Sequence, residues 1–357
     1  MRGPDPHGRT PLDHLLPDTL FTPLPAWGLV LAAVVGLAVL GRGADWLIEG
    51  ATDLAMRAGL PKVIIGATLL SLGTTAPECA VSVMAAVQGE PGLALGNAVG
   101  SVIFDTAVIF GVLSMFARLP ADRFVLSRQG WWQFGSAAML AVGTYGLYAA
   151  SGETAVIPRW FGILLLVLLA IYMAMSVRWA RSHPESGVQE MLEEGEHPDA
   201  AWKSVLWVFA GLALVLVAGR VTVASVSIAA LRAGVPGTVV AGTFVALGTS
   251  LPELVVGLTA LRRGHGEILV GNVIGADVLN VLFVVGAAAT ASPLPILEDE
   301  PPRYVFLTTY VPCMMAVLVY FRLCIARAVR VGSFDRWMGI PLVLAYLVYA
   351  VTQFTAG

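Results

Sequence analysis

Long apolar stretches alternate with short polar segments along most of the chain, and the stretches reach the roughly 20 residues that a helix needs to cross a membrane core. This pattern predicts five membrane helices before an acidic segment and five after it. The first five are predicted at Trp27–Arg57, Lys62–Val87, Gly92–Phe116, Ser127–Ala149 and Ile157–Val177. The second five are predicted at Trp202–Leu231, Gly237–Leu261, Glu267–Ala291, Tyr304–Ile325 and Trp337–Gln353. The predicted fold class is therefore an all-α integral membrane protein with ten transmembrane helices.

The composition agrees with many spans and excludes several classes of partner. Of the 357 residues, 57% are hydrophobic and 13% charged, whereas ordinary soluble domains are roughly 25% charged. No basic stripe is present, so we expect the lipid bilayer as surroundings and no nucleic acid as partner. Cys79, Cys313 and Cys324 lie in apolar runs without metal-type spacing and predict neither a disulfide framework nor a zinc site. No cofactor and no obligate protein partner is indicated.

An internal repeat relates the two halves of the chain. The segment Arg57–Gly111 aligns without a gap onto Arg232–Gly286, always 175 residues later. The matched residues are Gly, Pro, Asn, Thr and Glu, and not only the Leu, Val and Ala that any two apolar helices share, which indicates duplication. Five helices is an odd number, so the second copy enters the membrane from the opposite side. Inverted repeats of this kind place a binding site near the bilayer midplane, where the copies meet.

Positive charge in the short connections predicts the orientation. Fourteen Lys and Arg residues fall on one side of the ten-helix pattern and five on the other, and the richer side is expected to be cytoplasmic. Both termini of this multi-pass protein of the cell inner (plasma) membrane should then be extracytoplasmic. We divide the chain into an extracytoplasmic tail, a first five-helix repeat, an acidic cytoplasmic linker and a second five-helix repeat, at residues 1–26, 27–181, 182–201 and 202–357.

Each copy contains a break in its second helix, followed at once by an acid. Gly73–Glu78 (GTTAPE) in the first copy matches Gly248–Glu253 (GTSLPE) in the second. Proline lacks an N–H donor, so the break frees backbone carbonyls, and a desolvated cation can satisfy them. A charged group at the bilayer centre costs at least about 2.5 kcal/mol and normally faces a functional cavity. Glu78 and Glu253 are therefore the leading candidate cation ligands.

Hydroxyl, amide and further acidic side chains continue these faces. Helical spacing places Ser71 and Thr74 on the face of Glu78, and Thr249 and Ala246 on the face of Glu253. The next helix of each copy adds Asn97, Ser101 and Asp105, and their counterparts Asn272, Ala276 and Asn280. Hard oxygen ligands of this kind suit Ca²⁺, and the lack of sulfur and imidazole makes copper or zinc less suitable. Taken singly, the hydroxyls and amides are equally typical of helix–helix contacts.

The roles of Asp277, Asp45 and Glu49, which also lie within the predicted spans, are left open by the sequence. Asp277 lies three residues before Asn280 and borders the same face, yet its counterpart in the first copy is Val102, which no cation would use. Asp45 and Glu49 lie beside Arg42 near the end of the first helix. An ion pair there, or side chains that reach toward the membrane surface, explains these two acids more simply than cation binding.

The two break motifs, each followed by a Gly-Asn-x-x-Gly helix, resemble the alpha repeats of the Ca²⁺/cation antiporter superfamily, and above all those of prokaryotic Na⁺/Ca²⁺ exchangers. The resemblance covers nearly the whole chain in helix order, and its specific motifs occupy 55 residues in each half. It implies the Na⁺/Ca²⁺ exchanger fold, in which helices two, three, seven and eight enclose a row of cation sites. It also implies that helices one and six slide to alternate access.

The resemblance implies a ligand set as well. Glu78 and Glu253 would be central ligands shared by Ca²⁺ and Na⁺, with Asp105 and Asn280 beside them. Further hydroxyl or carbonyl oxygens would come from Ser71, Thr74, Thr75, Ser101, Ala246, Thr249 and Ser250. The chain departs from the pattern, because similar exchangers commonly have Asn at the position of Asp105 and Asp at that of Asn280. Ala276 and Asp277 replace an expected serine and asparagine, which leaves the outer Na⁺ sites and the counter-ion open.

The sequence thus predicts a secondary active antiporter, and not an enzyme, that exchanges Ca²⁺ for Na⁺ by alternating access. An empty site would leave carboxylates desolvated and mutually repelling, which penalises crossing without an ion. A Ca²⁺/H⁺ antiporter is the alternative within transport. A channel or an intramembrane hydrolase is more distant, and no His-Glu-x-x-His motif or serine–histidine pairing supports the hydrolase.

Overall fold

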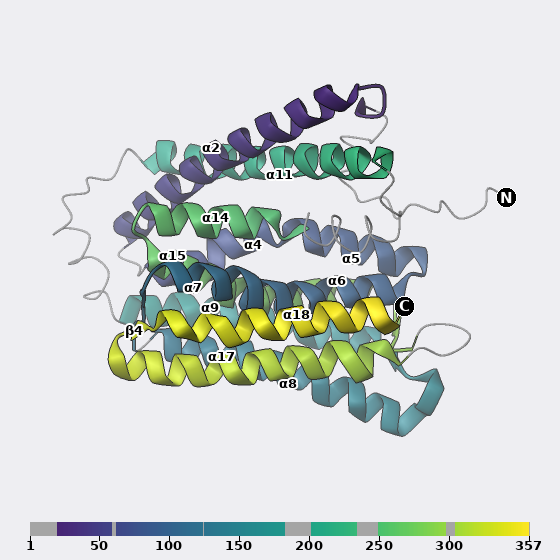
Figure 1. Ribbon diagram of the computed structural model, residues 1–357. Coiled ribbons are helices and arrows are strands. Elements are labelled where there is room, and N and C mark those ends of the chain that lie inside the picture. Colours follow the sequence, from purple (N-terminus) through teal and green to yellow (C-terminus); the bar gives the residue numbers. More distant parts are fainter. Residues whose placement is uncertain are drawn as a thin grey trace.

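The computed structural model describes residues 20–58, 62–123, 125–182, 201–233, 249–297 and 304–356. These residues form a bundle of long helices that run roughly alongside one another (Figure 1). The only strands among them are four strands of two residues each. The predicted all-α class is confirmed.

The first copy extends from α2 to α9 and contains two π-helical turns, η2 and η3. Its elements are α2 (Ala26–Ala58), α3 (Lys62–Ile65), η2 (Gly66–Leu70), α4 (Ser71–Thr74), α5 (Ala76–Gln88), α6 (Pro91–Phe104), η3 (Asp105–Phe110), α7 (Gly111–Phe116), β1 (Leu119–Pro120), α8 (Val125–Ser151), η4 (Gly152–Thr154), β2 (Val156–Ile157) and α9 (Arg159–Ser182).

The second copy extends from α11 to α18, with η6 and η7 as its π-helical turns. Its elements are α11 (Ala201–Arg232), α14 (Leu251–Arg262), α15 (Gly266–Leu279), η6 (Asn280–Val285), α16 (Gly286–Ala291), β3 (Leu294–Pro295), η7 (Phe306–Tyr310), α17 (Val311–Val331), β4 (Ser333–Phe334), η8 (Arg336–Met338) and α18 (Gly339–Ala356).

The element boundaries repeat at the sequence offset of 175 residues. α6, η3, α7 and β1 begin at positions 91, 105, 111 and 119, and α15, η6, α16 and β3 begin at 266, 280, 286 and 294. The short strands join the copies, because β1 pairs antiparallel with β4 and β2 pairs antiparallel with β3. The duplication inferred from the sequence is therefore also a structural duplication.

The helices account for the ten predicted spans. Six described helices are long and apolar enough to cross a membrane, and the bent helix Lys62–Gln88 makes a seventh. The other three predicted positions are occupied by α8, α14 and α18. Residues 234–248 lie outside the described part, so α14 is only the second half of the predicted seventh helix. Most of the predicted tail (1–26) and linker (182–201) is also outside it, and the domain limits stay predictions.

The second helix is broken where the sequence predicted. The axis bends by 44° between Lys62–Thr74 and Ala76–Gln88. Pro77 lies in the first turn of α5, where N–H groups have no acceptor within the helix, so its missing N–H does not weaken α5. In a continuous helix that N–H would have bonded to the Gly73 carbonyl, which therefore lacks its usual donor. The hairpin then closes at Gly89, whose φ of 83° is the left-handed conformation that favours glycine. Gly264, with φ of 81°, ends the corresponding helix of the second copy.

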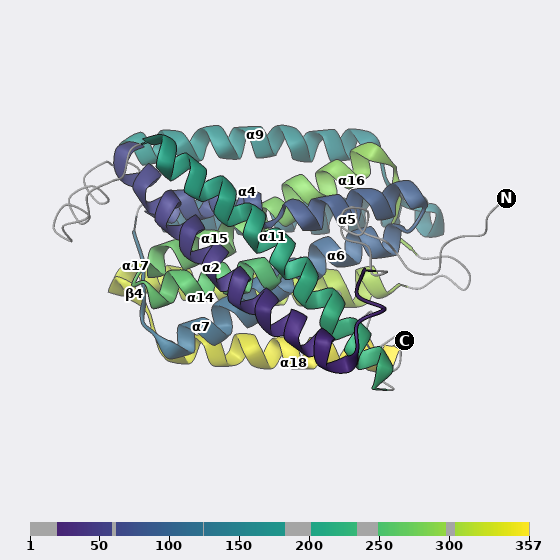
Figure 2. The ribbon, with the colours of Figure 1, turned by 90° about the horizontal axis from the view of Figure 1, so that it is seen from above.

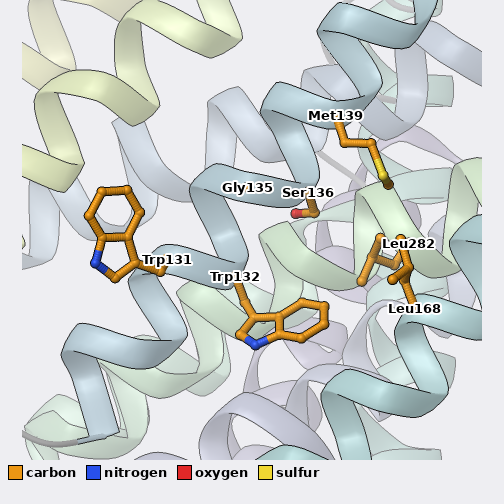
Figure 3. Close-up of a pocket in the computed structure, with 7 residues that line it drawn as sticks. All are labelled: Trp131, Trp132, Gly135, Ser136, Met139, Leu168 and Leu282. Carbon is orange, nitrogen blue, oxygen red and sulfur yellow. The ribbon is translucent and has the colours of Figure 1, made fainter.

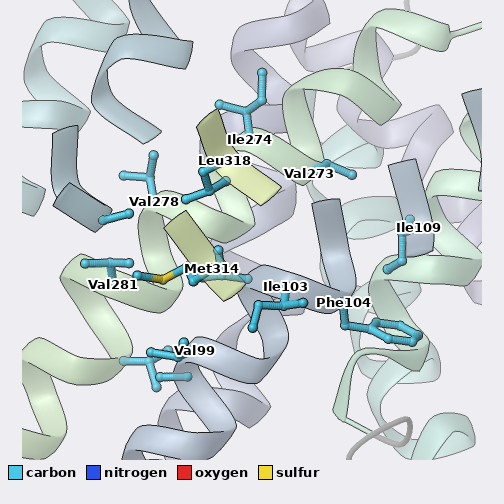
Figure 4. Close-up of a cluster of buried hydrophobic side chains, with 14 of the residues drawn as sticks. Val99, Ile103, Phe104, Ile109, Val273, Ile274, Val278, Val281, Met314 and Leu318 are labelled. Atoms are coloured by element: carbon cyan, nitrogen blue, oxygen red, sulfur yellow. The ribbon is translucent and has the colours of Figure 1, made fainter. Parts of the chain in front are cut away.

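The third and eighth helices form the centre of the molecule. In the apolar window of Gly266–Ala291, 94% of the residues are buried, and in that of Pro91–Phe116, 72% are, against 28–39% for the other long spans. Side chains of α6 and α15 pack against each other and against α17, as Val99, Ile103, Val278 and Met314 show (Figure 4). Residues on these two helices are therefore shielded from lipid by the rest of the bundle.

The helices α2 and α11 form an outer pair that crosses the bundle obliquely (Figure 2). Their contact is a stripe of small residues at intervals of seven, with Gly36, Gly43 and Gly50 of α2 facing the antiparallel α11 near Ala218, Gly211 and Ser204. A Cβ added at Gly211 would lie 2.5 Å from the Leu47 nitrogen and 2.6 Å from the Gly43 carbonyl oxygen. Backbone-to-backbone contact of this kind is typical of close helix pairs in membranes.

Substituting Gly211→Ala should destabilise the protein because the new methyl meets backbone atoms that cannot yield. We expect a loss of about 1–3 kcal/mol, seen as a lower melting temperature of the detergent-purified protein by tryptophan fluorescence. Gly41→Ala is the matched control, since a Cβ there meets nothing within 4 Å. Equal melting temperatures for the two variants would contradict the described helix contact.

Candidate cation-binding site

The two glutamates occupy equivalent positions directly after the helix breaks. Glu78 lies in the first turn of α5 and Glu253 in the first turn of α14, each preceded by a proline. Thr75 and Ser250, just before these helices, share nearly the same backbone conformation, with φ/ψ of −82°/−4° and −90°/5°. The glutamate side chains are 1% and 2% exposed. Both carboxylates therefore lie in the protein interior and not against hydrocarbon.

The glutamates lie close enough to act on each other electrostatically. Glu78 interacts with the charges of Glu253 and Asp105, and Asp105 also interacts with Glu253 and Asp277. The helix α5 packs against η6 and α14 packs against η3, so each glutamate helix contacts the π-helical turn of the other copy. No described Lys, Arg or His forms an ion pair with any of these four acids. The interface between the copies thus contains four buried carboxylates to which the described residues offer no basic partner.

Hydroxyl groups approach each glutamate from the opposite copy. Thr74 and Thr75 lie beside Glu253, and Thr249 lies beside Glu78. Both carboxylate oxygens of Glu78, and Oε2 of Glu253, nevertheless have no hydrogen-bond partner of good geometry within the described residues. Buried polar atoms normally have partners. These unpaired oxygens are therefore suited to bind a cation.

Asp105 and Asn280 meet at the centre of this interface. Each is the first residue of a π-helical turn, in η3 and η6 respectively, and such turns are frequent at functional sites. The Asn280 amide nitrogen donates to Asp105 Oδ2 at 3.4 Å, while Oδ1 of both side chains has no partner among the described residues. The two predicted flanking residues are thus one contacting pair drawn from both copies.

The predicted site residues differ in burial and in the hydrogen bonds they make. Ten of the twelve predicted site residues are at most 5% exposed, Thr249 is partly buried, and Ala246 lies outside the described residues. The Ser71 carbonyl accepts the Thr75 N–H at 2.8 Å and the Thr74 hydroxyl at 3.4 Å, so the break does not free it. Asn97, on the predicted face, donates to the Glu78 carbonyl and to Ser82 Oγ, which fixes α6 to α5.

Among the acids left open by the sequence, Asp277 joins the buried cluster and the other two do not. Asp277 accepts hydrogen bonds from Thr106 and Gln133, residues that the sequence analysis missed. The available signal was the polar pair Gln129 and Gln133, four residues apart in an otherwise apolar predicted helix.

The acids of α2 form ion pairs, one of the two explanations that the sequence left open, but not with the neighbouring Arg42. Arg263, the residue directly after α14, contacts Asp45 at 3.0 Å and Glu49 at 3.5 Å. The guanidinium group of Arg42 instead lies over the ring of Trp46, 5.6 Å from its centre. An arginine contributed by another helix could not be found from sequence spacing. These contacts border a groove of about 500 Å³ between α2 and α14.

Neither of the two features expected of a preformed metal site, a pocket lined by the acids and a cluster of three metal-ligating side chains, is found among the described residues. A pocket of about 270 Å³ lies between α8, α9 and η6, but its lining of Trp132, Met139, Leu168 and Leu282 is apolar and includes none of the acids (Figure 3). No three acidic, histidine or cysteine side chains of the described residues are close enough to hold a metal on their own. A cation between Glu78 and Glu253 would therefore also need hydroxyl and backbone oxygens.

Comparison with known families covers both copies. The model of the family described as sodium/calcium exchanger protein matches residues 28–178 and 203–355. The inner membrane protein YrbG of Escherichia coli (strain K12) is 30% identical over 321 residues, which cover 88% of this chain and 94% of that protein. The sodium/calcium exchanger MaX1 of Methanosarcina acetivorans is 27% identical over 356 residues, or 91% and 98% of the two chains.

Solved structures show the same fold. A structure of the sodium-calcium exchanger NCX_Mj superposes with a TM-score of 0.75 at 24% identity, covering 92% of this chain and 99% of that one. The predicted arrangement of ten helices in two inverted copies is confirmed by this likeness.

The contact between Asp105 and Asn280 can be tested by exchanging the two side chains. Asn280→Asp alone places two carboxylates in contact, and we expect it to lower stability by about 2 kcal/mol or more in cation-free buffer. The double variant Asp105→Asn with Asn280→Asp restores one acid and one amide, and should return to within about 0.5 kcal/mol of the native protein. Thermal unfolding in detergent measures both. A double variant as unstable as the single one would show that the pair is not in contact.

Proposed function

Because the chain belongs to the sodium/calcium exchanger protein family, we propose that it is a secondary active antiporter that exchanges Ca²⁺ for Na⁺ by alternating access. The observation that carries this proposal is the electrostatic interaction of Glu78 with Glu253 across the interface of the two copies, both of them buried and without a basic partner among the described residues. The relative YrbG is an inner membrane protein by name, which supports the inner membrane as location. The charge asymmetry of the loops supports extracytoplasmic termini.

The proposed mechanism follows from the charge of this interface. One Ca²⁺ balances Glu78 and Glu253, and two Na⁺ ions balance them equally well, but both loads together would exceed the negative charge of this pair. Hydroxyls of Thr74, Thr75 and Thr249, with Ser101, Ser250 and carbonyls of the break, complete the oxygen shell. Ca²⁺ takes six to eight such ligands. Ca²⁺ and Na⁺ therefore compete for one site and exclude each other.

An empty site resists the change between inward-facing and outward-facing states. Without cations, Glu78, Glu253 and Asp105 would repel one another in a medium that screens charge poorly. A conformational change that excludes water from the empty site increases this electrostatic repulsion. Only loaded forms then cross readily, and the gradient of one ion drives the other.

Removing either glutamate charge should abolish exchange. We expect Glu78→Gln and Glu253→Gln each to lower gradient-driven Ca²⁺ uptake by about 100-fold or more, because each substitution removes a charge-assisted ligand from a dry site. The measurement is uptake of radiolabelled Ca²⁺ into proteoliposomes loaded with Na⁺. Glu90→Gln is the matched control, since Glu90 is an exposed glutamate at the end of the same hairpin. Uptake that survives both substitutions would refute the proposed site.

The counter-ion can be identified by imposing a Na⁺ gradient and a pH gradient in separate experiments. H⁺ is the alternative to Na⁺, and the observation that favours it is the presence of four buried carboxylates able to take up protons. We expect an outward Na⁺ gradient at equal pH to drive Ca²⁺ uptake, and a pH gradient without Na⁺ to drive none. Uptake driven by the pH gradient alone would instead identify a Ca²⁺/H⁺ antiporter.

A further inference from the structure

The apolar pocket between α8, α9 and η6 follows the lipid-facing side of α8 for two helical turns. Trp131, Gly135 and Met139 line it at intervals of four residues, together with their neighbours Trp132 and Ser136 (Figure 3). Trp131 is 58% exposed, and Gly135 is exposed as well. Eight residues of α-helix extend over about 12 Å, so the pocket is an elongated groove that opens on the outer surface of the bundle.

The lining of this groove suits an apolar occupant. Leu168 of α9 and Leu282 of η6 form its other side. Its one hydroxyl group is already bonded, because Ser136 donates to the Gln133 carbonyl at 3.0 Å. Cavities with apolar walls do not hold water and accept apolar ligands. For a groove on a membrane-spanning helix, the apolar ligand in greatest supply is a lipid acyl chain.

An arginine lies at one end of the groove. The guanidinium carbon of Arg322 in α17 is 4.3 Å from the centre of the Trp131 ring, which is within the range of a cation–π contact. Its Nε and Nη1 have no hydrogen-bond partner among the described residues, and no described acid forms an ion pair with it. Arg327, five residues later, does have such a partner in Asp335 at 3.2 Å. Arg322 therefore has the capacity to bind an anion.

The charged and apolar parts follow one another as they do in a phospholipid. Trp131 is six residues, about 9 Å, from the first residue of α8 at Val125, so the Arg322 end of the groove lies toward the membrane surface. Met139 lies deeper along the same helix. The loop charges predict this surface to be cytoplasmic, and three further arginines occur at or before the start of α8: Arg118, Arg123 and Arg128.

We propose that this groove binds one anionic phospholipid of the leaflet at the start of α8. Its phosphate lies on Arg322 beside Trp131, and one acyl chain lies between α8, α9 and η6. A guanidinium group can donate two parallel hydrogen bonds to a phosphate, and basic pockets between membrane helices bind anionic headgroups. A zwitterionic lipid fills the groove equally well, but its own ammonium group offsets the attraction to the arginines. The groove contains none of the cation-site acids, so this proposal does not depend on the proposed function.

Binding of defined lipids to the detergent-purified full chain tests the headgroup end. Native mass spectrometry with added phosphatidylglycerol or phosphatidylcholine measures the affinity for each. The native protein should retain one phosphatidylglycerol more tightly than one phosphatidylcholine. Arg322→Gln should weaken phosphatidylglycerol binding about tenfold, as loss of hydrogen bonds to a charged group predicts, and should remove the preference. Arg330→Gln is the matched control, because it removes an exposed arginine of the same helix, and it should leave the preference unchanged.

Filling the groove tests the acyl-chain end. Gly135→Leu places a side chain in the groove, and a Cβ there meets nothing within 4 Å, so the fold should persist and lipid binding should be blocked. An unchanged melting temperature in lipid-free detergent checks the fold. Gly146→Leu is the matched control, because Gly146 is an exposed glycine of α8 with equally free space that does not line the groove.

Two outcomes contradict the proposal. Phosphatidylglycerol binding of native strength in either Arg322→Gln or Gly135→Leu would overturn it, because each substitution removes one of the two features that define the site. Equal affinity of the native protein for phosphatidylglycerol and phosphatidylcholine would also overturn it, since Arg322 would then contribute nothing to recognition.

Discussion

The burial of four carboxylates that have no basic partner in the described part of the chain is the constraint on which the rest of the structure depends. All four are at most 2% exposed: Glu78, Glu253, Asp105 and Asp277. Burying a charged carboxylate without a counter-charge costs several kcal/mol of desolvation, so folding alone does not favour this arrangement. The protein could have placed arginines beside them, as it does on the outer face, where Arg263 pairs with Asp45 and Glu49. Leaving the central acids unpaired keeps their charge available to ions, at the cost of stability when no ion is bound.

Irregular backbone is concentrated where these acids lie. The glutamates follow a break at the positive, N-terminal ends of α5 and α14, which favours negative charge. Asp105 and Asn280 begin the π-helical turns of the two central helices. The outer helices α2 and α11 are continuous over 33 and 32 residues and meet along small side chains. Disturbed backbone in a membrane is tolerated where protein and ions cover it, so the central helices can support the site and the outer pair can stay regular.

Much of this could be predicted from the sequence because the signals are local or repeated. Apolar length predicted the spans, and the constant offset of 175 residues predicted two copies with matched breaks at Pro77 and Pro252. Contacts between distant segments left no such signal. Arg263 is 218 residues from Asp45, and Gln133 is 144 residues from Asp277, so neither partner could be inferred from spacing. The ligand roles of the predicted site residues stay predictions, because proximity and burial do not by themselves identify an ion.

The two departures from the pattern of similar exchangers have different physical consequences. Asp105 and Asn280 contact each other across the interface, so an acid and an amide exchanged between the copies leave the chemistry of the pair unchanged. Asp277 has no such compensation, because its counterpart Val102 contributes no polar group. The first departure moves the acid of the pair from one copy to the other, and the second adds an acid, so each copy contributes two buried acids to the interface. Because Val102 stands at the place equivalent to Asp277, the two copies are chemically inequivalent in a fold whose backbone elements repeat at a constant offset.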